Sequence, residues 1–240
     1  DRQHLPGLRS NVLTSVDQFL RGRGVFSPQV SATGRGARLF GFILLFSALY
    51  GAAMGSFGLC ASGAPRLAAY PALVAAKTPI LLLGTFLLCL PSFFVLNAVF
   101  GLREDFPEAL RAVLGSLACL AVVLAAFAPV TLFVYLWTDY YDAAILFNGA
   151  VFAAAAGASL RVSRRYYGPL IRRSPRHRLL MLAWFGVYIF VAVQMAWTLR
   201  PFIGDPNPEA PVVLLRSTAL DNAWVEVARI IGQALRAMGM

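Results

Sequence analysis

The densest set of chemically capable side chains in this sequence is a run of arginines between two apolar stretches. Six of them, around Tyr166 and Tyr167, are candidates for docking a lipid headgroup or a partner chain: Arg164, Arg165, Arg172, Arg173, Arg176 and Arg178. A guanidinium forms paired, charge-assisted hydrogen bonds with phosphate or carboxylate, and each cation near an anionic leaflet contributes about 1 kcal/mol. The same run also serves as a topology signal, because arginines hold short loops in the cytoplasm. Both interpretations stay open.

Three amide side chains lie inside stretches that are otherwise apolar, namely Asn97, Asn148 and Gln194. Asn148 and Gln194 fall at a similar depth in the outer third of their spans. We therefore expect an interhelical hydrogen bond between these two amides, which contributes about 1 kcal/mol in lipid. The alternative is a small polar cavity that opens outward.

Four acidic residues and two cations fall near those ends of the apolar stretches that are far from the arginine run: Asp139, Asp142, Asp205, Glu209, Lys77 and Arg200. Such residues usually form surface pairs of little energetic value, and a divalent-cation site is the less favoured alternative. The three cysteines, Cys60, Cys89 and Cys119, have no CxxC spacing, and two of them lie inside apolar stretches. We expect neither a zinc site nor a disulfide framework.

The residues that several kinds of membrane chemistry require are missing from this sequence. Both histidines, His4 and His177, fall outside the apolar stretches, so these stretches offer no histidine to a haem or chlorophyll. No Asp or Glu lies mid-span, and no HExxH, GxSxG or Walker motif occurs. We therefore expect a protein without catalytic residues, metal or cofactor. A bound lipid, quinone or pigment would leave no signature among apolar side chains.

The elements that carry these residues follow from composition. The chain has 240 residues, of which 59% are hydrophobic and 13% charged, which excludes both an ordinary soluble domain and disorder. Five stretches have the length of about 20 apolar residues that crosses a bilayer. They are Arg38–Cys60, Lys77–Phe100, Leu110–Trp137, Tyr141–Leu160 and Leu179–Leu199. The sequence predicts an all-α polytopic membrane protein with five spans and a C-terminal amphipathic helix.

Charge gives the orientation. Arginine supplies 20 of the 21 basic residues, and these arginines border apolar stretches, so membrane lipid is a nearer partner than nucleic acid. The positive-inside rule places the N-terminus, the second loop and the fourth loop in the cytoplasm, and the C-terminus on the exoplasmic side. The preference for arginine over lysine, together with abundant alanine, is typical of proteins from high-GC bacterial genomes, so we expect a bacterial cytoplasmic (inner) membrane.

The sequence divides into three parts: a cytoplasmic segment over 1–37 with a short amphipathic helix, a membrane domain over 38–200, and an exoplasmic tail over 201–240. The tail contains an apolar stripe at helical spacing: Leu220, Trp224, Val227, Ile231 and Leu235. We expect this helix to lie on the membrane interface or to dock on a partner subunit, and covering the protein's own helix ends is the alternative.

Two spans carry small residues four positions apart, which lets helix backbones approach closely in lipid. The sets are Ser47, Gly51 and Gly55 in the first span, and Gly149, Ala153 and Gly157 in the fourth. We expect the first and fourth spans to pack on each other through these residues. The alternative is an interface with a partner subunit.

A cytoplasmic N-terminus, five spans over residues 38–200 and an exoplasmic C-terminus resemble the Yip1-type membrane protein architecture. Three segments resemble a group of uncharacterised bacterial membrane proteins: Leu90–Asn97, Tyr50–Gly55 and Trp197–Gly204. The cytosolic acidic-aromatic motif of eukaryotic Yip1-type members is not found before Arg38. The resemblance implies a membrane-organising, partner-binding protein and brings no catalytic residue to this sequence.

Together these patterns predict a non-enzymatic subunit or scaffold of a larger membrane complex, which binds hetero-oligomeric partner chains and anionic lipid. The alternative is the membrane component of a transporter or channel that another chain energises. An outward polar cavity around Asn148 and Gln194 would favour transport, whereas a dry helical core would favour the scaffold.

Overall fold

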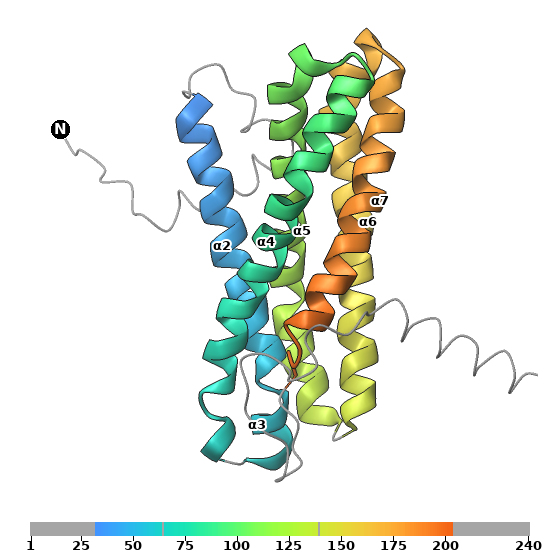
Figure 1. Ribbon diagram of the computed structural model, residues 1–240. Helices are drawn as coiled ribbons and strands as arrows, with labels where there is room; N and C mark the ends of the chain where they lie inside the picture. The colour runs from blue at the N-terminus through green and yellow to red at the C-terminus, as the bar shows by residue number, and fades with distance from the viewer. Residues whose placement is uncertain (1–31, 64, 139, 204–240) are drawn as a thin grey trace, which may run out of the picture.

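A computed structural model describes residues 32–63, 65–138 and 140–203, and every regular element in these residues is a helix. Five long helices lie side by side (Figure 1). They are α2 (Ala32–Gly55), α4 (Tyr70–Val99), α5 (Phe106–Trp137), α6 (Tyr141–Arg173) and α7 (Arg176–Thr198). The short helix α3 (Phe57–Ser62) follows α2, and the 3-10 turns η1 (Pro65–Leu67) and η2 (Arg103–Asp105) precede α4 and α5.

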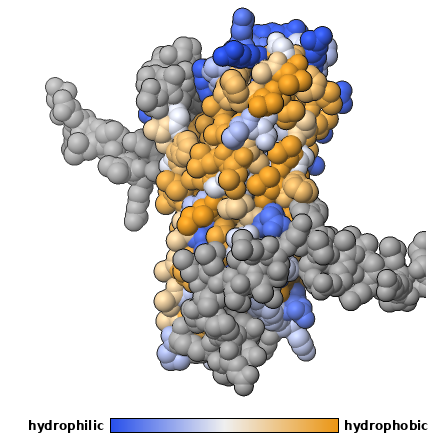
Figure 2. Space-filling model, viewed as in Figure 1, coloured by the Kyte–Doolittle hydropathy of each residue, from blue (hydrophilic) through white to orange (hydrophobic). Residues whose placement is uncertain are grey.

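The described chain has five helical stretches that are long and apolar enough to cross a membrane. The prediction of an all-α polytopic membrane protein with five spans is therefore confirmed. Figure 2 shows a broad apolar band on the visible face, with hydrophilic residues gathered at the upper end. Large apolar side chains such as Leu88, Val95 and Phe133 are exposed, as expected of residues that face lipid. The predicted amphipathic helices of the N-terminal segment and the C-terminal tail lie outside the described residues.

The segment between the fourth and fifth spans differs from the prediction. The sequence analysis ended the fourth span at Leu160 and treated the following arginines as a loop, but α6 continues to Arg173 and α7 begins at Arg176. The prediction was wrong because hydropathy marks where a helix leaves the bilayer and not where it ends. Arginine is a good helix former, and buried residues continue at helical spacing past the last apolar turn: Ser163, Tyr166, Tyr167 and Leu170.

The packing of the first span also differs from the prediction. Helix α2 packs on α4 and α5, while α6 packs on α5 and α7 packs on α4. A Cβ atom placed on Gly51 would lie 2.5 Å from the Val74 carbonyl oxygen, and one on Gly55 would lie 2.9 Å from the Val74 Cβ. The small residues of the first span therefore bring α2 against α4, and not against the fourth span.

Candidate functional site

Asn148 is the centre of a buried polar cluster that joins three helices. Its amide nitrogen donates to the Tyr135 hydroxyl on α5 and, at 2.7 Å, to the Ala144 carbonyl, and its amide oxygen accepts from the Tyr50 hydroxyl on α2 at 2.8 Å. All three side chains of this cluster are buried. The expected pair between Asn148 and Gln194 is therefore wrong, because two tyrosines already satisfy this amide.

The other two amides of the spans lie elsewhere. Asn97 is fully buried near the end of α4 and donates from its side chain to the Phe93 carbonyl at 2.8 Å. The backbone carbonyl of Asn97 accepts from the backbone N–H of Leu102, in a turn where Gly101 adopts a positive φ of 71°. Gln194 is half-buried on α7, and its backbone carbonyl accepts from the Thr198 hydroxyl. The structure does not bring these two amides together with Asn148.

Lys77 is a buried cation that the sequence analysis placed at the edge of a span. It is 1% exposed, and its Nζ donates to the Pro201 carbonyl at 2.9 Å. The Tyr70 hydroxyl donates to the same oxygen at 3.1 Å. A lysine on α4 thus anchors the chain that follows α7, whereas Arg200 stacks over the Trp197 ring at 4.8 Å. Asp142 is exposed at the start of α6, and the other three acidic residues of the predicted set lie outside the described residues.

The six predicted docking arginines are all exposed at one end of the bundle, on α6 and the start of α7. Arg173 pairs with Glu108 at 2.7 Å and with Asp105 at 3.2 Å, and Arg176 donates to the Phe100 carbonyl at 3.5 Å. The remaining four make no ion pair with the described residues: Arg164, Arg165, Arg172 and Arg178. We call this end of the bundle, with these six residues and Arg161, the arginine end.

Three residues lie among these arginines in the sequence but are buried in the bundle: Tyr166, Tyr167 and His177. Tyr166 and Tyr167 are buried, and the Tyr166 ring fills the space beside Gly115 of α5, where a Cβ atom would meet it at 2.8 Å. His177 is fully buried at the start of α7, and its Nε2 lies 3.0 Å from the Asp105 Oδ2. Their role is therefore to join α5, α6 and α7. Sequence reasoning missed this because a helix that leaves the bilayer still has a buried side.

The small residues of the fourth span lie on the outside of the bundle. Gly149, Ala153 and Gly157 are exposed, and a Cβ atom on either glycine would meet nothing within 4 Å. The opposite side of α6 packs on α5, where the Ser159 hydroxyl donates to the Ser116 carbonyl at 2.6 Å. Ser47, Gly51 and Gly55 of the first span are buried. The two predicted sets therefore lie in opposite surroundings.

The described residues contain no group of three or more His, Cys, Asp or Glu that could hold a metal ion, and the three cysteines are free. The expectation of no cofactor stays a prediction. The stripe at Leu220, Trp224, Val227, Ile231 and Leu235 lies outside the described residues.

No family model, curated protein or solved structure matches this chain. The likeness to Yip1-type proteins therefore stays a prediction.

Proposed function

We propose that this chain is a non-enzymatic integral membrane subunit or scaffold, which binds partner chains within the bilayer and anionic lipid at its arginine end. We place it in a bacterial cytoplasmic membrane with the N-terminus and the arginine end in the cytoplasm. The distribution of arginines supports this orientation, because eight arginines lie near the end formed by η2 and the α6–α7 turn: Arg103, Arg111, Arg164, Arg165, Arg172, Arg173, Arg176 and Arg178.

The observation that carries the proposal is the contrast between the two sides of α6. Its inner side packs on the bundle, where Asn148 bonds two tyrosines and Ser159 bonds the backbone of α5. Its outer side exposes Gly149 and Ala153 with free space around them. Exposed small residues on a membrane helix let another helix approach closely, where packing drives association.

The same contrast weighs against the transporter alternative. An outward polar cavity around Asn148 and Gln194 would favour that alternative. Asn148 is instead buried, and its hydrogen bonds close the contact between α2, α5 and α6. The hydrogen bonds of Asn148 thus support packing between helices, as expected of a scaffold.

The test is purification of the full chain from its native membrane in mild detergent, followed by mass spectrometry of the chains that migrate with it. We expect partner chains in stoichiometric amount. Replacing Gly149 and Ala153 together by leucine should release them, because the larger side chains hold the partner helix away from α6. The matched control is Gly41→Leu on α2, which is also exposed and has nothing within 4 Å of its Cβ position.

Two results would overturn this proposal. The first is a lone monomer or a homo-oligomer from the native membrane. The second is an equal loss of partners in the α6 variant and in the Gly41→Leu control, since that result would show a general response to added bulk.

A further inference from the structure

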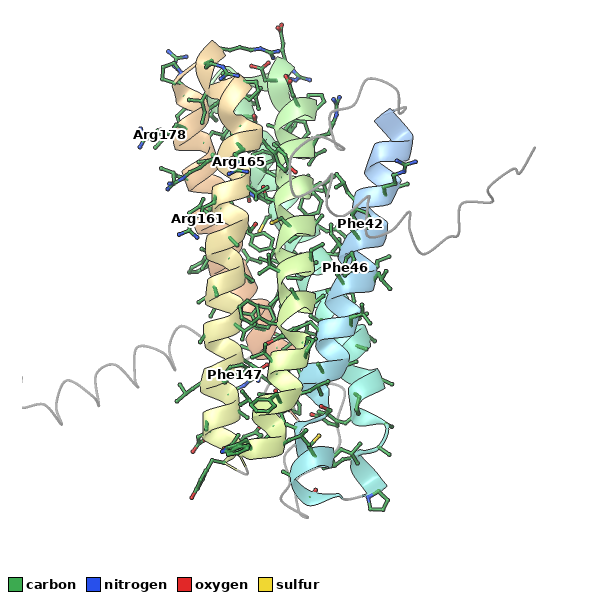
Figure 3. The ribbon with its side chains drawn as sticks, turned by 180° about the vertical axis from the view of Figure 1, so that it is seen from behind. Phe42, Phe46, Phe147, Arg161, Arg165 and Arg178 are labelled. Carbon is green, nitrogen blue, oxygen red and sulfur yellow. The ribbon has the colours of Figure 1, made fainter. Side chains whose placement is uncertain are left out.

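The outer side of α6 carries a line of arginines that runs into the apolar part of the bundle. Arg161, Arg165 and Arg172 are separated by four and seven residues, so they share one line on the helix surface, and all three are exposed. Figure 3 shows Arg161, Arg165 and Arg178 at successive heights along one side of the molecule. The buried side of α6 is occupied by Ser159 and Tyr166, which keeps this line facing outward.

These arginines are not neutralised by the part of the chain that the structure describes. Two carboxylates at this end of the bundle, Asp105 and Glu108, both pair with Arg173, and Asp105 also contacts His177. Neither Arg161 nor Arg165 makes an ion pair with a described residue. The positive charge on this side of α6 is therefore open to an outside anion.

The depth of Arg161 is unusual for an unpaired cation. Helices α6 and α7 form an antiparallel hairpin with two residues between Arg173 and Arg176. Arg161 is twelve residues before the end of α6, which is about 18 Å of helix rise. It therefore lies level with the part of α7 near Tyr188, well past Leu179, where the apolar stretch of α7 begins.

A contact with α5 gives the same depth independently. Ser159, two residues before Arg161, bonds the Ser116 carbonyl, ten residues after α5 begins at Phe106. On α7, Leu182 and Ile189 are exposed and apolar. A guanidinium at this depth extends toward the headgroups and attracts an anion to itself, because a lone charge is costly beside hydrocarbon.

We propose that the outer line of α6 is a binding site for one anionic phospholipid, whose phosphate is held by Arg161 and Arg165. Below these arginines the same line continues as exposed small residues, Gly157, Ala154 and Ala150. Small side chains offer an acyl chain a smooth surface along α6. The order of charge followed by apolar surface along α6 thus matches a headgroup followed by its chain. This inference rests on the lipid-binding part of the proposed function.

The test uses the full chain, purified and delipidated in detergent and titrated with short-chain phosphatidylglycerol, with bound lipid counted by native mass spectrometry. Replacing Arg161 and Arg165 together by glutamine should weaken binding roughly fivefold for each arginine, about 25-fold in all. The matched control is Arg103→Gln with Arg111→Gln, which removes the same charge from exposed residues at the same end, on η2 and α5 instead of α6. This control should change the affinity for phosphatidylglycerol by less than about threefold, because its two arginines lie outside the proposed site.

A second variant tests the acyl-chain surface with both arginines intact. Gly157→Leu should weaken phosphatidylglycerol binding, whereas Gly41→Leu on α2 should not. Glycerophosphoglycerol, which is the headgroup without chains, should not displace the bound lipid at the same concentration. If it does, the site binds the phosphate group alone and the phospholipid assignment is wrong.

The outcomes separate this inference from the proposed function. If the α6 variant and the Arg103/Arg111 control weaken binding equally, the whole arginine end attracts lipid and no site exists on α6, while the proposed function stands. If the unaltered chain shows no preference for phosphatidylglycerol over phosphatidylcholine, the lipid part of the proposed function fails as well. If the α6 variant keeps its lipid and instead loses a protein partner, these arginines bind that chain and the inference is overturned.

Discussion

Two stripes of small residues with the same spacing have opposite surroundings in this protein. Gly51 and Gly55 of α2 face α4 so closely that a single added carbon would collide with Val74. Gly149 and Gly157 of α6 have nothing within 4 Å of their Cβ positions. The spacing indicates that another helix can approach this one closely. It does not indicate whether that helix belongs to the same chain or to another molecule.

The polar residues of each helix decide which way its stripe faces. On α2, Tyr50 is next to Gly51 and bonds Asn148, so the contact with α6 is made by a hydroxyl and not by a glycine. On α6, Asn148 and Ser159 both bond inward, to α2 and α5 respectively. Bonding these groups to the bundle turns Gly149 and Gly157 away from it. The polar side chains therefore fix the helix rotation, and the small residues follow.

The sharpest way to break this comparison is to add the same bulk to both stripes. Gly51→Leu should lower the free energy of unfolding by about 3 kcal/mol, because overpacking forces α2 away from the α4 backbone. Gly149→Leu should change it by less than about 0.5 kcal/mol, as substitutions at open surface sites do. Unfolding of the purified chain in mixed micelles titrated with dodecyl sulfate measures both values.

Equal losses in the two variants would contradict the comparison, since Gly149 would then have a packed neighbour within the chain. An unchanged Gly51→Leu variant would show that α2 and α4 are not in the contact described here. A variant that does not fold at all can be replaced by Gly55→Ala, whose Cβ would meet the Val74 side chain at 2.9 Å.

The polar cluster offers a test of intermediate size. Tyr50→Phe and Asn148→Ala should each lower the free energy of unfolding by about 1 kcal/mol, and the coupling between them should be about 0.6 to 1.7 kcal/mol, the range of hydrogen bonds between membrane helices. The same micelle titration gives the double-mutant cycle. Tyr140→Phe, at an exposed tyrosine before α6, is the control and should have no effect. Additive single variants would mean that the Tyr50–Asn148 bond does not orient α6.

The five spans were predictable because apolar length alone marks a membrane helix. The amides inside them were also visible, since Asn148 and Gln194 stand out in apolar surroundings. The partner of Asn148 was not, because a tyrosine in a span is compatible with an apolar core, a lipid interface or a hydrogen bond, and only the packing of α2 and α5 selects the third. A prediction that pairs the two amides by depth ignores which face of each helix they occupy.

The arginine end shows the same division between residue type and position. The sequence singled out the docking arginines, and the structure leaves five of the six without an ion pair among the described residues. The neutralisation of Arg173 by Asp105 and Glu108 could not be predicted, because it depends on the turn before α5 meeting the end of α6. The burial of His177 depends on the same meeting.

The smallest expected effect has the opposite sign to the first. Gly149→Ala should raise the free energy of unfolding of the purified chain by about 0.5 kcal/mol, because glycine in an exposed helix costs backbone entropy and the added methyl group meets nothing. Gly51→Ala should lower it, since its methyl group would lie 2.5 Å from the Val74 carbonyl. The same titration distinguishes the two signs. A glycine that weakens its own helix is explained if another molecule needs the space, so a stabilised Gly149→Ala chain that also retains less of its partner would link the exposed stripe to binding. If the chain is stabilised and its partner is fully retained, the exposed stripe does not bind the partner, and lipid is then the expected contact on the outer side of α6.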